Sequence, residues 1–142
     1  MKPTILLLLL AILTLTAPVR AGGEHGHSHS HATIEVPATV PEIRAEIANQ
    51  QKKMSEAFAA RDAATAHAAC DVLNACVRAL PAAATSLDEA ARQRVAGMAN
   101  NAAKAWSNAV HLAEDGDFTK AAAEVAKADA AYKLLEARLP KI

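Results

Sequence analysis

The sequence has few aromatic residues and few glycines. Aromatic side chains make up 3% of the chain, and 5 of its 142 residues are glycine. Sandwiches and barrels of β-strands draw on aromatic and β-branched residues, so this shortage argues against them. Alanine instead supplies about a quarter of the residues, and alanine has the highest helix propensity of all amino acids. The composition therefore predicts an all-α protein.

The sequence also has no excess of charge of either sign. It contains 15 Lys and Arg residues against 15 Asp and Glu residues. Loss of Lys2 and Arg20 with the leader described next lowers the net charge to about −2, which gives nucleic acid no basic surface to bind. The chain has no nucleophile elbow, phosphate-binding loop or H-E-x-x-H motif, so we do not expect an enzyme.

The longest apolar run lies at the N-terminus, over residues 5–15. Lys2 precedes the run, and Val19-Arg20-Ala21 after it resembles a small-residue cleavage site. An uncleaved membrane anchor is the weaker alternative, because a span needs about 18 apolar residues. We therefore expect residues 1–21 to be a signal peptide, and the mature chain to be periplasmic or secreted without stable membrane insertion.

Residues 22–40 have no helical periodicity and are expected to form a disordered, histidine-rich arm. Four of the six histidines of the chain lie in its segment HGHSHSH, at His25, His27, His29 and His31. Alternate residues of an extended chain project to the same side, so several imidazoles can reach one ion. Neutral imidazole binds Cu(II), Ni(II), Zn(II) and Co(II), and the sequence does not select among them. The alternative is a merely solubilising polar tail.

Residues 41–142 carry apolar side chains at helical spacing and are expected to form one domain. The pattern predicts four helices, at residues 41–60, 62–80, 86–115 and 117–139. Short turns between long helices favour an up-down-up-down four-helix bundle, with a pair of helical-repeat hairpins as the alternative. Because so many core positions are alanine, the helices are expected to approach each other closely.

Capping residues and prolines set the expected helix boundaries. Thr39, Asp62 and Asp117 are expected to cap the first, second and fourth helices. Ser86 and Glu89 form an S-x-x-E capping box for the third helix. Pro81 and Pro140 are expected to end the second and fourth helices.

Two copies of the pattern H-x-A-x-D lie in the predicted bundle. His67 and Asp71 belong to the start of the second helix, and His111 and Asp115 to the end of the third. In an up-down bundle both histidines lie at the same end, where with Cys70 they would form a second metal site. Each histidine is roughly 120° from the centre of its apolar stripe, which favours two surface histidines with ordinary helix ion pairs over a shared site.

The chain has two cysteines, Cys70 and Cys76, on one predicted helix. Six residues of helix separate their Cα atoms by about 9 Å, which is beyond disulfide reach. Burial of both thiols is the favoured interpretation. The alternatives for Cys70 are a metal or redox thiol, or a bond to another chain in a homodimer.

The stretch WSNAVHLAEDGDFTKAAAEVAKADAAYKLLEARL, residues 106–139, resembles the last hairpin of cytochrome b562-type four-helix bundles. That resemblance implies the bundle fold and a haem held by a Met early in the first helix and a His late in the fourth. Tyr132 and Lys133 stand where that His would fall, and Met54 lies several residues late. The departure argues against haem.

Most of the mature chain also resembles small exported helical proteins found alongside bacterial heavy-metal efflux systems. The resemblance lies in a histidine early in the second helix and another before an Asp-Gly turn, here His67 and His111 with Asp115-Gly116. It implies an exported metal-binding protein that acts as a buffer, sensor or chaperone in heavy-metal homeostasis, with a periplasmic efflux component as a partner. The alternatives are a helical interaction module with an incidental arm, and a redox or haem-type electron carrier.

Overall fold

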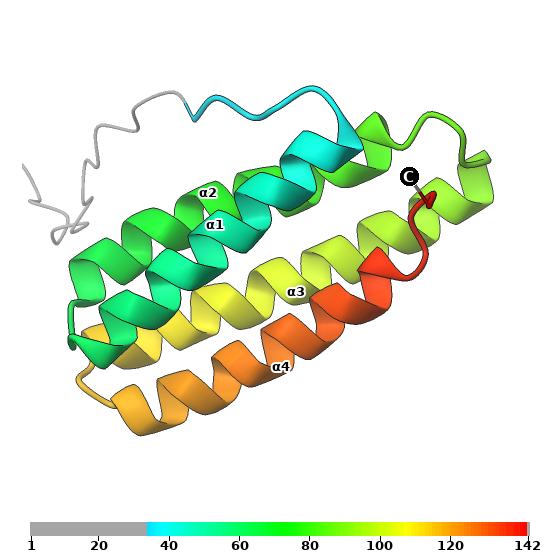
Figure 1. Cartoon of the computed structure of the whole chain (residues 1–142). Helices are drawn as coiled ribbons and strands as arrows, with labels where there is room; N and C mark the ends of the chain where they lie inside the picture. The colour runs from blue at the N-terminus through cyan, green and yellow to red at the C-terminus, as the bar shows by residue number, and fades with distance from the viewer. Residues whose placement is uncertain (1–33, 142) are drawn as a thin grey trace, which may run out of the picture. The chain divides into compact units, whose positions relative to one another are not determined.

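The computed structural model describes residues 34–141, and this part of the chain is all helical. Its four helices are α1 (Val40–Ala59), α2 (Ala63–Ala83), α3 (Glu89–Glu114) and α4 (Phe118–Glu136), as Figure 1 shows. No strand occurs among the described residues, so the predicted all-α class is confirmed for them. The predicted signal peptide and the four histidines of the arm lie outside the described residues.

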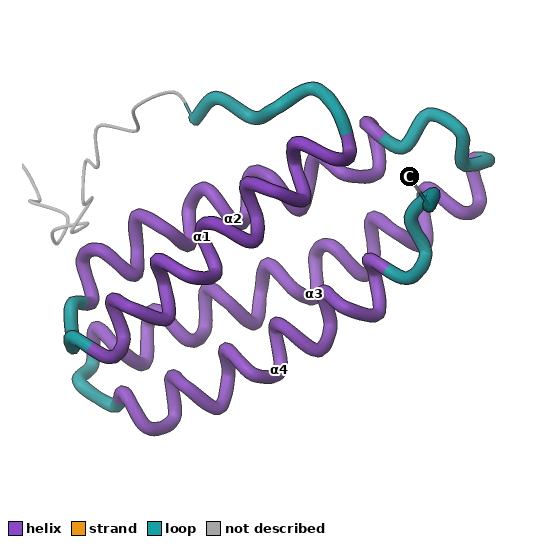
Figure 2. The backbone as a smooth tube through the Cα atoms, viewed as in Figure 1, coloured by secondary structure: helices purple, strands orange, loops and turns teal. Residues whose placement is uncertain are grey.

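Consecutive helices pack side by side: α1 on α2, α2 on α3, and α3 on α4. They run in alternating directions and are joined by short loops (Figures 1 and 2), as expected for an antiparallel four-helix bundle. Long polar side chains connect α1 with α4. Nε of Arg44 donates to Glu136 at 2.8 Å, and Nε2 of Gln51 donates to Asp129 at 2.9 Å.

The core contains one large aromatic side chain among many small ones. Trp106 is fully buried, and its indole ring lies 6.0 Å from the ring of Tyr132. Fully buried alanines occur on three of the helices, namely Ala66, Ala102, Ala103, Ala109, Ala121 and Ala128. Alanine at these positions lets the helix backbones approach closely, so the core is thin, as the composition predicted.

Three of the four predicted caps are confirmed. The side chains of Thr39, Asp62 and Asp117 each accept a hydrogen bond from a backbone N–H in the first turn of α1, α2 and α4. A side-chain oxygen at this position satisfies one of the amide donors that a helix leaves unpaired at its start. Residues 34–39 precede α1 without helical structure, and Val36 among them packs partly buried against the core.

The predicted cap of the third helix is wrong by two residues. Asp88 caps α3, and its Oδ1 accepts from the backbone N–H of Ala91 at 2.7 Å. The N–H of Leu87 instead bonds the carbonyl of Ala84, so the chain is still in a turn after Ser86. A charged carboxylate is also favoured over a hydroxyl at the positive end of the helix dipole.

Neither proline ends its helix as predicted. α2 continues past Pro81 to Ala83, and the hydrogen bond that the proline removes lies in the last turn of the helix, where few bonds follow it. α4 ends at Glu136, four residues before Pro140. The N–H of Arg138 bonds the carbonyl of Leu135, and this tighter turn brings Leu139 into the core with 6% of its surface exposed.

Within residues 34–141, no helix has the length and apolar character needed to cross a membrane.

Candidate functional site

The start of α2 and the end of α3 lie side by side at one end of the bundle (Figure 1). His67 lies in the second turn of α2, and His111 lies in the last turn of α3. The side chain of His67 is 35% exposed and that of His111 is 69% exposed. His67 is therefore half-buried at the flank of its helix and His111 is a surface residue, yet they face the same carboxylate.

That carboxylate belongs to Glu114, the last residue of α3. Its Oε1 lies 2.6 Å from Nδ1 of His67, and its Oε2 lies 3.2 Å from Nδ1 of His111. Because each Nδ1 contacts one oxygen of the same carboxylate, the distance between the two Nδ1 atoms cannot exceed the sum of these two contacts and the distance between the two oxygens. One side chain joins the two imidazoles, which come from different helices.

Asp71 completes the polar cluster on the α2 side. Its Oδ2 lies 3.8 Å from Nε2 of His67, one helical turn earlier. His67 therefore has a carboxylate near each of its ring nitrogens. Such partners fix the orientation of an imidazole ring and raise its basicity.

Glu114 is ionised under neutral conditions. The hydrogen bond with His67 lowers the pKa of Glu114, the bond with His111 lowers it further, and partial burial opposes both effects. The Glu114 side chain is 40% exposed, so solvent screens its interactions with the two imidazoles.

The partner of His111 is Glu114 rather than Asp115, which the H-x-A-x-D pattern predicted. Asp115 is exposed and forms the C-cap of α3, where its backbone N–H bonds the carbonyl of His111. Gly116 follows with a φ of +86°, and the N–H of Asp117 bonds the carbonyl of Leu112. This is a Schellman turn, which ends the helix at Glu114 and makes that residue the terminal carboxylate beside the histidines.

Cys70 lies beneath the histidines with 3% of its surface exposed. Burial raises the pKa of the Cys70 thiol to about 11, so the sulfur is protonated at neutral pH. Nδ2 of Asn74 lies 3.5 Å from Cys70 Sγ and donates to Oγ of Ser107 at 3.0 Å. The hydroxyl of Ser107 donates in turn to the carbonyl of Ala103.

These side chains line a small pocket, which we call the histidine pocket. Its volume is about 130 Å³, and its lining residues are His67, Cys70, Asp71, Asn74, Ser107, Val110 and His111. Oδ1 of Asn74 is buried and has no hydrogen-bond partner among the described residues. An unpaired buried acceptor is costly, so the pocket has a polar group that a small ligand or water would satisfy.

The second cysteine takes no part in the histidine pocket. Cys76 is fully buried in the core, and burial, followed by the charge of Glu46, raises the pKa of its thiol. Both cysteines are free, as the helical spacing predicted.

The structure brings some residues of the predicted second site close together and leaves others apart, and whether they bind a metal stays a prediction. The structure brings together His67, Asp71 and His111, places Cys70 in the wall of the same pocket, and leaves Asp115 outside it. As they stand, the side chains of residues 34–141 contain no group of three or more His, Cys, Asp or Glu arranged to hold a metal ion. The arm histidines lie outside the described residues.

The sequence prediction did not include three polar residues of this cluster, namely Glu114, Asn74 and Ser107. Glu114 follows His111 by three residues, and this spacing places two side chains on one helix face as well as a spacing of four does. Asn74 follows Cys70 by one helical turn. Ser107 gives no signal in the sequence, because its contact with Asn74 depends on the register between α2 and α3.

No protein-family model matches the chain, and searches of curated proteins and of solved structures found no significant match. The functional proposal therefore depends on the residues of the histidine pocket and on the histidine-rich sequence before the bundle.

Proposed function

We propose that this protein is an exported, non-enzymatic carrier of divalent transition metal ions, with Cu(II), Ni(II), Zn(II) and Co(II) as the candidate ions. It acts as a buffer, sensor or chaperone in metal homeostasis. The observation that carries the proposal is the contact of one carboxylate, that of Glu114, with imidazoles from two helices. Two imidazoles and a carboxylate form a donor set that suits these metals.

Metal binding in the histidine pocket requires a change in the hydrogen bonds that the cluster now makes. A zinc–nitrogen bond is about 2.0–2.1 Å long, so an ion cannot fit inside the 2.6 Å contact between His67 and Glu114. The ion instead replaces the proton of that hydrogen bond as the two side chains rotate apart. His67, His111 and Glu114 are all at least one-third exposed, so rotation displaces no core residue.

The chemistry of the cluster assigns a role to each member. His67 and His111 are the primary ligands, Glu114 is the third, and Asp71 orients the His67 ring. Cys70 joins only if the metal displaces the thiol proton, whose pKa is about 11. Binding through these groups releases protons, so the affinity falls as the pH is lowered.

The arm supplies a second and more open set of ligands. Its histidines at positions 25, 27, 29 and 31 alternate with glycine and serine. A chain of this composition captures and releases an ion readily, whereas ligands on two packed helices are held closer to a fixed geometry. We assign capture of the ion to the arm and retention of the ion to the histidine pocket.

Calorimetry of residues 22–142 against each of the four ions tests this division. The protein is purified without a histidine tag, since a tag would add a competing site. We expect two classes of site in the wild-type chain. Replacing the four arm histidines by glutamine removes one class, and the double variant His67→Gln/His111→Gln removes the other. Absence of binding tighter than about 100 μM for every ion, a free energy of only about −5.5 kcal/mol, contradicts the proposal.

A helical interaction module is the alternative function. Leu134, with 65% of its surface exposed, is the one large apolar side chain exposed on the described residues. A single exposed leucine is much smaller than the apolar patches that mark protein interfaces. Light scattering distinguishes the two functions, because an interaction module that dimerises gains mass with concentration and does so without metal.

A further inference from the structure

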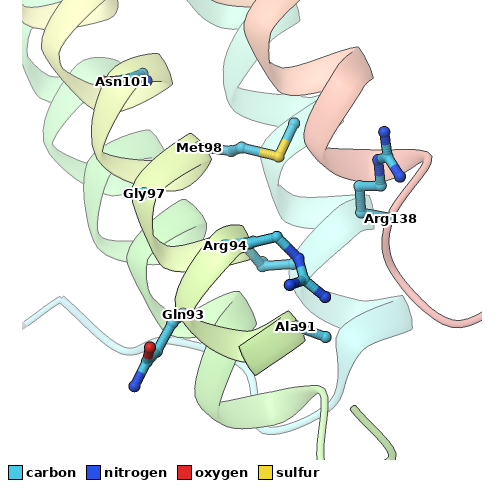
Figure 3. Close-up of a pocket in the computed structure, with 8 residues that line it drawn as sticks. Ala91, Gln93, Arg94, Gly97, Met98, Asn101 and Arg138 are labelled. Atoms are coloured by element: carbon cyan, nitrogen blue, oxygen red, sulfur yellow. The ribbon is translucent and has the colours of Figure 1, made fainter. Parts of the chain in front are cut away.

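A groove of about 610 Å³ lies between the first half of α3 and the turn that follows α4 (Figure 3). Arg94 and His111 are 17 positions apart on α3, which corresponds to about 25 Å at 1.5 Å per residue. The groove is therefore at the opposite end of the bundle from the histidine pocket, and nothing in the metal proposal involves it.

Two arginines line this groove, which we call the arginine groove. Arg94 comes from α3 and Arg138 from the turn after α4. Figure 3 shows the Arg94 side chain extending from α3 into the space between these elements, with Arg138 on the opposite side of that space. Neither has an ion pair or hydrogen bond through its guanidinium within residues 34–141, whereas Arg44 and Arg92 each pair with a glutamate. Since no carboxylate of the described residues pairs with either guanidinium, the two arginines give this groove a positive charge that attracts an anion.

The floor between the two arginines is apolar. Gly97 is exposed, and a Cβ built on it would meet no atom within 4 Å, so the groove lining has bare backbone at this point. The thioether of Met98 reaches from α3 toward Arg138 (Figure 3), and Val95 lies one turn before it. Methionine adapts its shape to an apolar ligand, and the polar end of Asn101 borders the same space.

We propose that the arginine groove binds a small organic anion, a carboxylate on an apolar body. The guanidinium fork matches the geometry of a carboxylate and forms paired, charge-assisted hydrogen bonds with it. The apolar body lies on Gly97, Met98 and Val95. The volume is within the range of about 300–1,000 Å³ that is typical of small-molecule sites.

NMR titration of ¹⁵N-labelled residues 22–142 with octanoate tests the proposal. Octylamine and octanol serve as probes of the same length with a positive charge and with none, and inorganic phosphate serves as an anion without an apolar body. We expect octanoate alone to shift the amides of Gly97, Met98 and Arg138 in a saturable way, with a Kd of about 1 mM or tighter.

Two pairs of variants separate specific binding from general charge effects. The double variant Arg94→Gln/Arg138→Gln is compared with Arg94→Gln/Arg78→Gln, which removes the same charge but keeps Arg138. We expect the first to weaken octanoate binding at least tenfold more than the second does. Gly97→Leu places a bulky side chain on the groove lining and abolishes binding, while Asn100→Leu, on the same helix but outside the lining, leaves it unchanged.

Three results would overturn the proposal: no saturable shift with octanoate, an equal loss in both double variants, or equal affinity for phosphate and octanoate. Because all titrations are carried out without metal, failure of this proposal leaves the metal proposal untouched.

Discussion

Glu114 and His67 connect the end of α3 to the start of α2, with Oε1 of the glutamate 2.6 Å from Nδ1 of the histidine. The same carboxylate contacts His111 from its own helix. This relationship places both histidines of the bundle on one donor cluster without burying either. A charged cluster at a helix end, partly open to solvent, can exchange a proton for a metal ion at little cost to the fold.

Replacing Glu114 by glutamine tests the contribution of this contact to stability and to its pH dependence. The fold lowers the pKa of Glu114 below its ordinary value of 4.5, first through the bond with His67. The stabilisation is therefore present above pH 4.5 and is lost as the pH falls through the lower, folded pKa. We expect Glu114→Gln to reduce the free energy of unfolding by up to about 1 kcal/mol at pH 6, and by less at pH 3.

Urea unfolding at the two pH values measures the difference. Glu56→Gln is the matched control, because Glu56 is exposed and its contact with Lys52 is long, at 3.9 Å. If the difference in the free energy of unfolding between wild type and Glu114→Gln were larger at pH 3 than at pH 6, the assigned direction of the pKa shift would be wrong.

The start of α3 gives a test of the corrected cap. Asp88→Ala removes the acceptor of the Ala91 N–H and should cost about 1 kcal/mol of stability. Ser86→Ala should change the stability by no more than about 0.5 kcal/mol, because Ser86 lies before the cap on an exposed turn. Urea unfolding of the two variants decides between the caps. A larger loss of stability for Ser86→Ala than for Asp88→Ala would show that Ser86, in the S-x-x-E capping box, is the cap after all.

Asp129 accepts hydrogen bonds from two donors that differ in burial, the buried Trp106 and the half-buried Gln51. Oδ1 of Asp129 accepts from Nε1 of Trp106 at 3.2 Å and from Nε2 of Gln51 at 2.9 Å. Asp129→Ala leaves the buried indole N–H without a partner and should cost about 2 kcal/mol, whereas Gln51→Ala should cost about 1 kcal/mol or less. Unfolding followed by far-UV circular dichroism measures both, and equal losses would contradict the asymmetry.

The thiol of Cys70 should be unreactive in the folded protein. Its burial and its pKa of about 11 reduce the thiolate fraction at pH 8 about a hundredfold relative to an ordinary cysteine. Alkylation by iodoacetamide, followed by mass spectrometry, should therefore be fast in urea and slow in buffer. Reaction in buffer at the rate of an exposed thiol would show that the histidine pocket opens.

Local signals in the sequence were sufficient to predict where most helices begin, but not which side chains contact one another around His67 and His111. Thr39, Asp62 and Asp117 cap helices whose first turns are determined by neighbouring residues. The third cap was misassigned because Ser86 and Asp88 compete within three residues, and the charged group prevails. The approach of His67 to His111 followed from the alternating directions of the helices.

The identity of the bridging carboxylate could not be read from the sequence. Glu114 and Asp115 both lie one turn from His111, and which of them contacts it depends on where the helix ends. The Schellman turn at Gly116 ends it at Glu114. The contact of Asn74 with Ser107 depends likewise on the packing register of α2 against α3, which no local pattern encodes.

The most direct test of the metal proposal follows both imidazoles of the bundle during a Zn(II) titration. The protein is residues 22–142 with its four arm histidines replaced by glutamine, and the ring nitrogens of His67 and His111 are observed by long-range ¹H–¹⁵N NMR. We predict that both rings shift together and saturate at one equivalent of Zn(II), and that Glu114→Gln weakens binding about tenfold or more. Rings that do not shift, or that saturate independently of each other, would contradict a shared site.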